Sequence, residues 1–226
     1  MIEEMKLNYL KSLSIFRNFQ DKQLEQIAQA VKIRQLVSGE VINYGSATLS
    51  KIYFVVSGKI KVAEINDVED ELIKDILNGG EIFGDLELEG DSKNYEFAEA
   101  LMDNTIICSL GTTDFINLLR TYPETAIIYA KKVSMKLKRL EDRYSDLMLL
   151  NVRSRLVRFM KNWATIEGSK IGDKVILQNY LTHSDIAGII STSRQTVSIL
   201  FKEMKDSGLL HYNRKLIQLN DPTNWN

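Results

Sequence analysis

The sequence has few of the residues that hold metals and disulfides. Its 226 residues include one cysteine, Cys108, and two histidines, His183 and His211. A single cysteine excludes a disulfide or a cysteine-ligated cluster within one chain. Because no histidine precedes His183, the N-terminal part also lacks ligands for a histidine-bound metal or haem. We therefore expect no metal site, no haem and no iron–sulfur cluster. We also expect that the protein is not an enzyme. A cupin-like metalloenzyme is the disfavoured alternative.

Long apolar runs are also missing. No segment approaches the roughly 20 apolar residues that a membrane-spanning helix needs. The opening residues, MIEEMKLNYLKSL, contain no apolar core of the kind found in a secretory signal. Hydrophobic residues make up 44% of the chain and charged residues 26%, which is typical of a folded globular protein. We expect a cytoplasmic protein without membrane contact, long enough for two domains.

The net charge of −1 conceals an uneven distribution. Residues 151–226 carry 11 Lys and Arg against 6 Asp and Glu, whereas residues 1–120 carry 12 against 20. A basic segment can bind phosphate, and an acidic one is repelled by nucleic acid. Nucleic-acid binding is therefore expected in the C-terminal part only.

Residues 181–219 follow the pattern of a helix-turn-helix with a β-hairpin wing. Thr182 and Asp185 form a capping-box-like start to the first helix, and Ser193 can cap the second. Gly208 ends the second helix, and strand, turn and strand follow. Several residues stay exposed where a major groove would be read, namely Ser193, Arg194, Gln195, Thr196 and Ser198. Sequence-specific DNA binding is the leading interpretation, and a winged helix used for protein contact is the alternative.

Residues 31–110 consist of short β-rich runs separated by glycines and polar turns. The predicted strands are Lys32–Val37, Glu40–Tyr44, Lys51–Val56, Lys59–Ile65, Glu71–Leu77, Tyr95–Leu101 and Thr105–Leu110. Many short strands at regular intervals predict a β-roll or barrel. The last strand contains Cys108 in an apolar run that typically buries an inert thiol, with redox sensing as the alternative.

A long helix that begins at Pro123 carries a heptad pattern. Its apolar positions alternate in steps of four and three, at Ala126, Ala130, Val133, Leu137, Leu140, Tyr144 and Leu147. Such an a/d stripe predicts a coiled-coil contact, which favours a homodimer. Burial of the stripe against the chain's own β-domain is the alternative. Ile127, Ile128 and Met135 lie off the stripe and are candidates for the intrachain contact.

The order of β-roll, long helix and winged helix resembles the CRP/FNR family of bacterial transcription regulators over nearly the whole chain. The resemblance is carried by SGEVI at 38–42, IYFVVSGKIKV at 52–62, GGEIFGDLEL at 79–88 and LTHSDIAGIISTSRQTVSILFKEMKDSGLL from residue 181. It implies an α+β fold with an N-terminal double-stranded β-helix (a cupin-like β-roll), a long dimerisation helix and a C-terminal winged helix-turn-helix. The expected domains are an effector roll at 1–120, a dimerisation helix at 121–150 and a DNA-binding domain at 151–226. Double-stranded DNA and RNA polymerase are the implied partners, with a small-molecule effector of unknown identity.

The run at 79–88 resembles the phosphate-binding cassette of cyclic-nucleotide-binding domains. The resemblance places a ligand pocket at Gly84, Asp85, Leu86, Lys93, Asn94 and Tyr95. cAMP-binding members have an arginine and a small residue where this chain has Asn94 and Tyr95, and no arginine occurs between Lys59 and Arg120. A cyclic phosphate would lose a charge-assisted contact of about 1.5–3 kcal/mol. We therefore expect a roll that does not bind cAMP, and a cAMP- or cGMP-responsive regulator with altered phosphate contacts is the alternative.

The recognition helix also departs from the family pattern. Arg194 matches a base-reading position, Gln195 replaces a common glutamate, and Ile199 stands where a second arginine is usual. Because glutamine prefers adenine, the operator should differ from the family consensus while keeping two related half-sites. Ser198 is a further base-reading candidate. The resemblance implies phosphate contacts at Ser184, Ser193 and Thr196 and, on the wing, at Asn213, Arg214 and Lys215.

Overall fold

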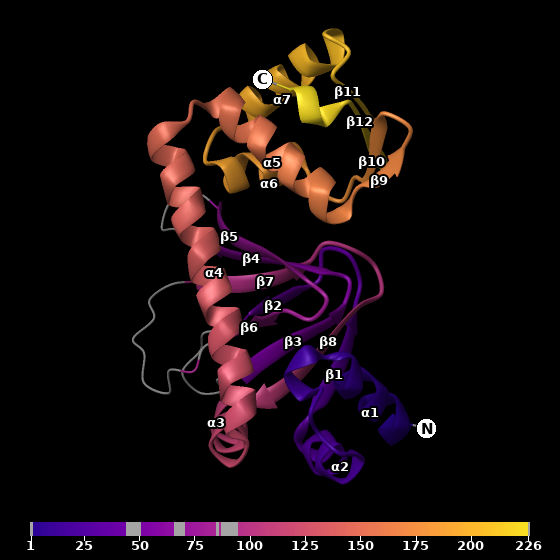
Figure 1. Ribbon diagram of the computed structural model, residues 1–226, viewed down its shortest axis with the longest axis vertical. Helices are drawn as coiled ribbons and strands as arrows, with labels where there is room; N and C mark the ends of the chain where they lie inside the picture. Colours follow the sequence, from indigo (N-terminus) through magenta and orange to yellow (C-terminus); the bar gives the residue numbers. More distant parts are fainter. Residues whose placement is uncertain (1, 44–50, 66–70, 85, 87–94, 226) are drawn as a thin grey trace. The chain divides into compact units, whose positions relative to one another are not determined.

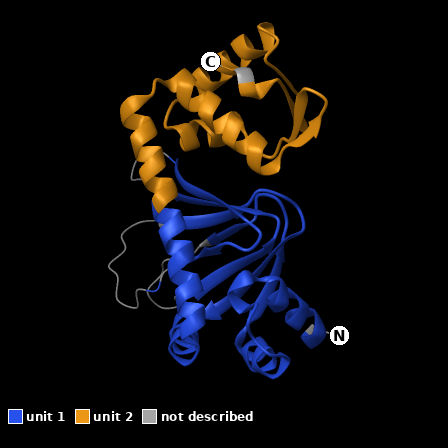
Figure 2. Ribbon diagram, in the orientation of Figure 1, with its two compact units in different colours: residues 1–137 blue, residues 138–226 orange. Residues whose placement is uncertain are grey.

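The computed structural model describes residues 2–43, 51–65, 71–84, 86 and 95–225 (Figure 1). The chain divides into two compact units, residues 1–137 and residues 138–226 (Figure 2). The division falls inside one continuous helix, α4 (Pro123–Leu149). The predicted α+β fold with a β-roll, a long helix and a winged helix-turn-helix is confirmed. The domain limits at residues 120 and 150 stay a prediction.

Two antiparallel four-stranded sheets form the roll of the first unit. One sheet has the order β1-β8-β3-β6, and the other has the order β2-β7-β4-β5. The strands are β1 (Lys32–Leu36), β2 (Val41–Asn43), β3 (Lys51–Ser57), β4 (Lys59–Ile65), β5 (Glu71–Asn78), β6 (Ile82–Phe83), β7 (Tyr95–Ala100) and β8 (Thr105–Gly111). Each strand expected from the sequence is present, with small differences at its ends. The sequence missed β6, which is only two residues long and pairs with Tyr53 and Phe54.

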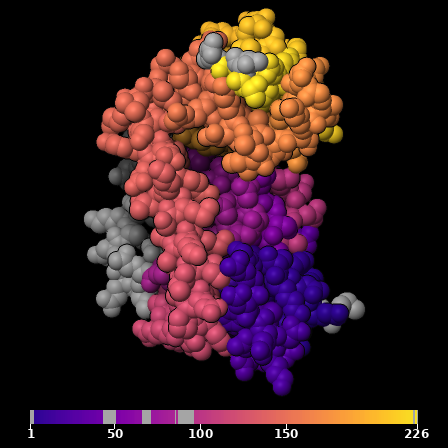
Figure 3. All heavy atoms as spheres, in the orientation of Figure 1, coloured from indigo at the N-terminus to yellow at the C-terminus, as the bar shows by residue number. Residues whose placement is uncertain are grey.

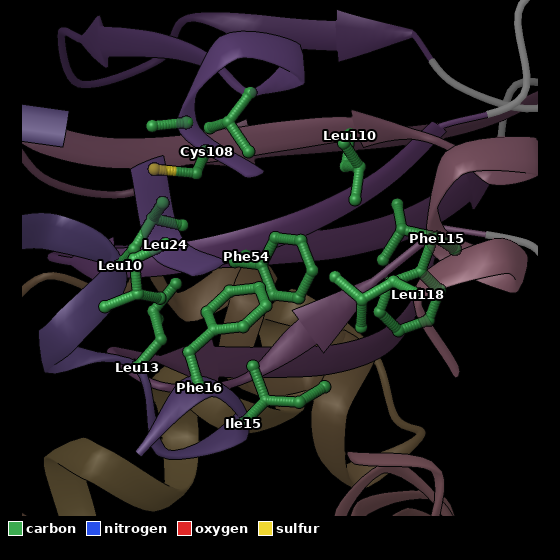
Figure 4. Packing of buried hydrophobic residues seen from close by; sticks show 13 residues of the cluster. Leu10, Leu13, Ile15, Phe16, Leu24, Phe54, Cys108, Leu110, Phe115 and Leu118 are labelled. Atoms are coloured by element: carbon green, nitrogen blue, oxygen red, sulfur yellow. The ribbon is translucent and has the colours of Figure 1, made fainter. Parts of the chain in front are cut away.

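Strand β3 shows how the roll acquires two cores. Its residues are buried on both faces, because side chains alternate along a strand. Tyr53 and Val55 point into the core between the two sheets. Ile52 and Phe54 point outward into a second core, which helices cover (Figure 4). Those helices are α1 (Ile2–Ser12), the 3-10 turn η1 (Ser14–Phe16), α2 (Asp21–Ala30) and α3 (Thr112–Thr121).

The first half of α4 packs on the outer core through one side. Ile128 and Tyr129 contact that core, Thr125 is buried, and the Lys132 ammonium donates to the Gly80 carbonyl oxygen at 2.8 Å. The expectation that Ile127 and Met135 also serve this contact is wrong, because their side chains are 57% and 67% exposed. Helical periodicity explains the difference, since residues 125, 128, 129 and 132 share one face.

The second unit is a winged-helix domain built around one antiparallel sheet. Its sheet has the order β11-β12-β10-β9. The elements are the end of α4, then α5 (Val152–Glu167), β9 (Ser169–Ile171), β10 (Lys174–Gln178), α6 (His183–Ile190), α7 (Arg194–Asp206), β11 (Leu210–Tyr212), β12 (Leu216–Asn220) and the 3-10 turn η2 (Pro222–Asn224). The expected wing is the β11–β12 hairpin, and the sequence missed β9 and β10. Among the described residues, no helix is both long and apolar enough to cross a membrane.

Candidate DNA-binding interface

Helix α6 begins with a complete capping box. The Thr182 hydroxyl oxygen accepts the Asp185 backbone N–H at 3.1 Å, and the Asp185 carboxylate accepts the Thr182 backbone N–H at 2.8 Å. These bonds satisfy backbone donors that a helix start leaves open. Ile186, Ala187 and Ile190 are buried on one side of the helix. The sequence therefore fixes both where α6 starts and which face it buries.

The turn between the two helices needs one left-handed residue. Ser191 ends α6 with φ +54° and ψ +66°. Ser193 then starts α7, because its hydroxyl oxygen accepts the Thr196 backbone N–H at 3.1 Å. At the far end, Gly208 has φ +73°, and Leu209 donates its N–H to the Met204 carbonyl oxygen at 2.9 Å. This is the glycine termination expected after α7.

The first turn of α7 presents the predicted base-reading side chains. Val197, Phe201 and Met204 are buried, so the opposite side of the helix faces outward. Gln195 is exposed on that side, and Arg194 is exposed as the first residue of the helix. The interface thus combines a guanidinium and an amide at the end of a helix that caps and core contacts hold in place.

Several other candidates have a structural role as well. The Ser198 hydroxyl donates to the Arg194 carbonyl oxygen at 3.0 Å and lies 2.9 Å from His183 Nδ1. The Ser193 and Thr196 hydroxyls lie 2.8 Å apart and hydrogen bond to each other. These bonds position the first turn of α7. A base contact by Ser198 would compete with them.

His183 is the residue that the sequence interpretation missed. It is the first residue of α6, and its ring lies 4.8 Å from the Phe201 ring and 5.7 Å from the Tyr212 ring. The residue therefore joins α6, α7 and the wing strand β11. Burial, together with the nearby Arg194 guanidinium, lowers the pKa of His183. Nothing in the local sequence marked this histidine, because its partners are 15 to 29 positions away.

The wing turn is built by Asn213. Its side-chain oxygen accepts the N–H groups of Lys215 and Leu216 at 2.8 and 2.9 Å. Asn179 donates to the Asn213 carbonyl oxygen at 2.7 Å, which ties the wing to the segment before α6. Arg214 and Lys215 are exposed at the tip. Ser184, the remaining phosphate candidate, is exposed on the first turn of α6.

Two arginines hold the last turn of α6. Arg155 of α5 donates to the carbonyl oxygens of Ile190 at 2.9 Å, Ser191 at 3.1 Å and Leu150 at 2.8 Å. Arg143 donates to the Ile189 carbonyl oxygen at 3.2 Å. These residues also line a small pocket, together with Asp146 and Leu147 of α4. Because a helix end leaves carbonyls without partners, both arginines stabilise the turn that leads into α7.

The expected ligand pocket is only partly within the described residues. Asp85, Lys93 and Asn94 lie outside them. Gly84 follows β6 with φ +105°, and a Cβ at this position would lie 2.2 Å from the Lys51 carbonyl oxygen. Leu86 packs against the outer core of the roll. Tyr95 begins β7, opposite Ile65 of β4. Gly84 is thus required by the turn itself, whatever the roll binds.

Beside the start of β7 lies an ion-pair cluster on three neighbouring strands. Lys74 of β5 pairs with Glu64 of β4 at 2.7 Å and with Glu96 of β7. Burial disfavours the charged lysine, but the hydrogen bonds to both glutamates outweigh it and raise the pKa of Lys74. Two carboxylates and one ammonium leave this part of the roll negatively charged.

The heptad stripe on α4 is exposed in the single chain. Val133 is 48% exposed, Leu137 55%, Leu140 60%, Tyr144 61% and Leu147 43%. Figure 3 shows atoms of α4, in salmon, on the visible surface of the molecule. Ala130 is also exposed, and Ala126 is half-buried. Within the first unit, Val133 and Leu137 are therefore not buried against the β-roll.

Two capped helices, an exposed polar first turn and a basic hairpin are the features of a winged helix-turn-helix protein that contacts DNA. Comparison with known proteins agrees. The model of the cyclic nucleotide-binding domain matches residues 33–122, and that of the Crp-like helix-turn-helix domain matches residues 154–224.

Similar proteins match over most of their length. The Global nitrogen regulator of Nostoc sp. is 22% identical over 173 residues, which is 76% of this chain and 78% of the relative. The cAMP-activated global transcriptional regulator CRP of Haemophilus influenzae is 22% identical over 166 residues, which is 74% of each chain. A structure of a CooA mutant from Carboxydothermus hydrogenoformans has a TM-score of 0.74 at 23% identity, covering 92% of this chain and 91% of that one.

The chain belongs to the CRP/FNR family of transcription regulators. Its members are regulators with a helix-turn-helix DNA-binding domain and are not enzymes.

Proposed function

We propose that the protein is a homodimeric regulator that reads two related DNA half-sites through α7, and that its roll does not bind cAMP. The exposed first turn of α7 is the observation that carries this proposal. Arg194 and Gln195 stand there on a helix whose start is fixed by the Ser193 cap. Arginine pairs with guanine and glutamine with adenine in the major groove. Ser184, Arg214 and Lys215 are exposed on the flanking α6 turn and wing, where they can contact phosphate.

The dimer is supported by the exposed stripe on α4. Five of its side chains, from Val133 to Leu147, are each at least 43% exposed and follow heptad spacing. A row of large apolar side chains in water is unfavourable, and pairing with the same row of a second chain would bury it. Two copies of α7 would then read two half-sites, as two-fold regulators do.

The roll's chemistry supports a signal other than cAMP. The cluster of Lys74, Glu64 and Glu96 adjoins the start of β7, where the family resemblance places the cyclic phosphate. Its two carboxylates would repel an anion, and its lysine is already bound. The alternative, a cyclic-nucleotide receptor with altered phosphate contacts, is favoured by the match of residues 33–122 to the cyclic nucleotide-binding domain. RNA polymerase stays an expected partner on the strength of the family.

Selection of bound sequences from a random DNA library tests the central claim. Purified protein should enrich a two-fold-related pair of half-sites whose centres are one helical turn, or a multiple of it, apart. Sedimentation velocity of the free protein should show a dimer. Failure to enrich any sequence, with or without cyclic nucleotides, would contradict the proposed DNA reading.

Arg194→Ala tests the base contact. We expect specific affinity to fall by about 1–3 kcal/mol and one base position in each half-site to become degenerate. Lys170→Ala removes one exposed positive charge from the same unit, away from α7, and is the matched control. Equal losses in the two variants would show that Arg194 contributes charge and no base readout.

Calorimetry with cAMP and cGMP tests whether the roll binds a cyclic nucleotide. We expect no binding heat at micromolar ligand. A micromolar dissociation constant for either nucleotide would replace the proposal with the cyclic-nucleotide alternative, and the DNA-binding claim would be unaffected.

A further inference from the structure

The outer face of α7 is polar except at one position. Ile199 is 59% exposed, and it is the one large apolar side chain that this fully described helix exposes. The exposed residues one turn away are Gln195 before it, and Lys202 and Glu203 after it; the Glu203 carboxylate pairs with Arg153. Positions 195, 199 and 202 share one face of a helix. Ile199 therefore lies in line with a predicted base reader.

Packing within the chain does not account for Ile199. The buried residues Val197 and Phe201 each lie two positions away, which places them on the opposite side of the helix. A β-branched residue also has a lower helix propensity than alanine or lysine. A single exposed apolar residue is ordinary on a protein surface. At the centre of a groove-reading face, however, it has a specific counterpart in DNA.

We propose that Ile199 reads the 5-methyl group of a thymine. The inference rests on the proposed docking of α7 in the major groove. Among the base edges in that groove, the thymine methyl is the apolar group, and apolar side chains recognise it by contact. Four residues of helix rise separate Ile199 from Gln195 by about 6 Å. That distance is close to two base-pair steps of roughly 3.4 Å. The thymine should thus lie about two base pairs from the adenine read by Gln195.

Replacement of thymidine by deoxyuridine in the DNA tests the contact, because their bases differ only by the 5-methyl group. In the selected operator, each thymine is replaced in turn, in both half-sites together, and the affinity of the wild-type protein is measured. Burial of one methyl group is worth about a fourfold change in affinity, so two half-sites should lose about fifteenfold. We expect this loss at one position per half-site and less than about a twofold effect at the others.

Ile199→Ala completes the comparison. The variant should fold normally, since the side chain is exposed and alanine favours helix. It should bind the thymine operator about as weakly as wild type binds the uracil operator, and the remaining effect of the methyl group should be below about twofold. Its affinity for random DNA should equal that of the wild type.

Three results would overturn the proposal. The first is that no thymine of the operator proves sensitive to loss of its methyl group with the wild-type protein. The second is that Ile199→Ala shows the same sensitivity as the wild type. The third is that Ile199→Ala loses as much affinity for random DNA as for the operator. The absence of any selected operator is a separate result, which contradicts the docking of α7 itself.

Discussion

Arg155 should contribute more to the stability of the DNA-binding unit than any other surface arginine of α5. Its guanidinium donates to three backbone carbonyl oxygens, of Leu150, Ile190 and Ser191, at 2.8 to 3.1 Å. Arg155→Met keeps most of the aliphatic stem and removes every donor. Ile190 and Ser191 then lose the cation that neutralises the end of α6.

The size of the effect follows from those bonds. A hydrogen bond to a charged group contributes about 1.5–3 kcal/mol, and such contributions do not add fully. The bonds to Leu150 and Ile190 are partly buried, while the bond to Ser191 is exposed and water can replace it. We therefore expect Arg155→Met to lower the free energy of unfolding by about 2–4 kcal/mol. Arg155→Lys keeps the charge but not the planar fork, so about half of that loss should remain.

Tryptophan fluorescence during urea unfolding measures this change. The chain has two tryptophans, Trp163 and Trp225, and both are buried in the second unit. The signal therefore reports the unfolding of that unit. The urea midpoint should fall while the slope stays unchanged.

Arg153→Met is the matched control. Arg153 lies one half-turn earlier on α5 and forms a single ion pair with Glu203 at 3.0 Å, in which both side chains are about half exposed. An exposed pair of this kind contributes about 1 kcal/mol or less. If Arg155→Met costs no more than Arg153→Met, the carbonyl contacts do not stabilise the turn before α7, and our reasoning is refuted.

Three further predictions concern the roll and α4. Leu140→Glu should weaken the dimer by at least about a hundredfold in sedimentation experiments, because two buried leucines are lost per dimer; Met135→Glu, on the opposite side of α4, should not. Gly84→Ala should lower the free energy of unfolding of the roll by about 2–4 kcal/mol, since φ is +105° and the new methyl meets the Lys51 carbonyl oxygen. Gly39→Ala, with φ +83° and open space, should cost only about 1 kcal/mol, so equal losses would argue against the clash. Burial raises the pKa of Cys108 to about 11, against a weaker opposing effect of Lys6, so the thiol should react with maleimide at pH 8 only after unfolding. Rapid labelling of the folded protein, or a changed oxidant response in Cys108→Ser, would instead support redox sensing.

Much of the local structure was predictable because its signals lie within a few residues. Thr182 with Asp185, and Ser193 with Thr196, are capping pairs three positions apart, and each starts the helix that the sequence indicated. Pro123 opens α4 as its first residue, where a missing N–H costs nothing. The strands of the roll were found for a related reason, since glycines and polar turns interrupt short β-rich runs.

Most of the misses have a different cause. Strand β6 pairs with Tyr53 and Phe54, far back along the chain, and β10 pairs with β12, as in Asn220 opposite Lys174. Strand β9 is the exception, because it pairs with its neighbour β10 across a turn at Gly172, which is a local signal that the sequence interpretation overlooked. Ile127 and Met135 were expected to contact the roll, but that face is set by the rotation of α4 against a core that the sequence does not reveal. The same limit applies to the site. Sequence spacing indicated Ser198 as a base reader, and only folding brings His183 within 2.9 Å of its hydroxyl.

The sequence by itself determined the order of elements, the capped helices, the exposed Arg194 and Gln195 at the start of α7, and the family. These features depend on residue types at short, fixed spacings, which are legible without coordinates. The tertiary structure decided which polar groups hydrogen bond within the chain, and it showed that Arg155 donates to the carbonyl oxygens of the turn before α7. It also showed that Ile199 is the large apolar side chain that α7 exposes. Such properties depend on which distant segments of the chain contact each other. Whether a side chain is buried or exposed, and what that costs in free energy, is decided only by those contacts.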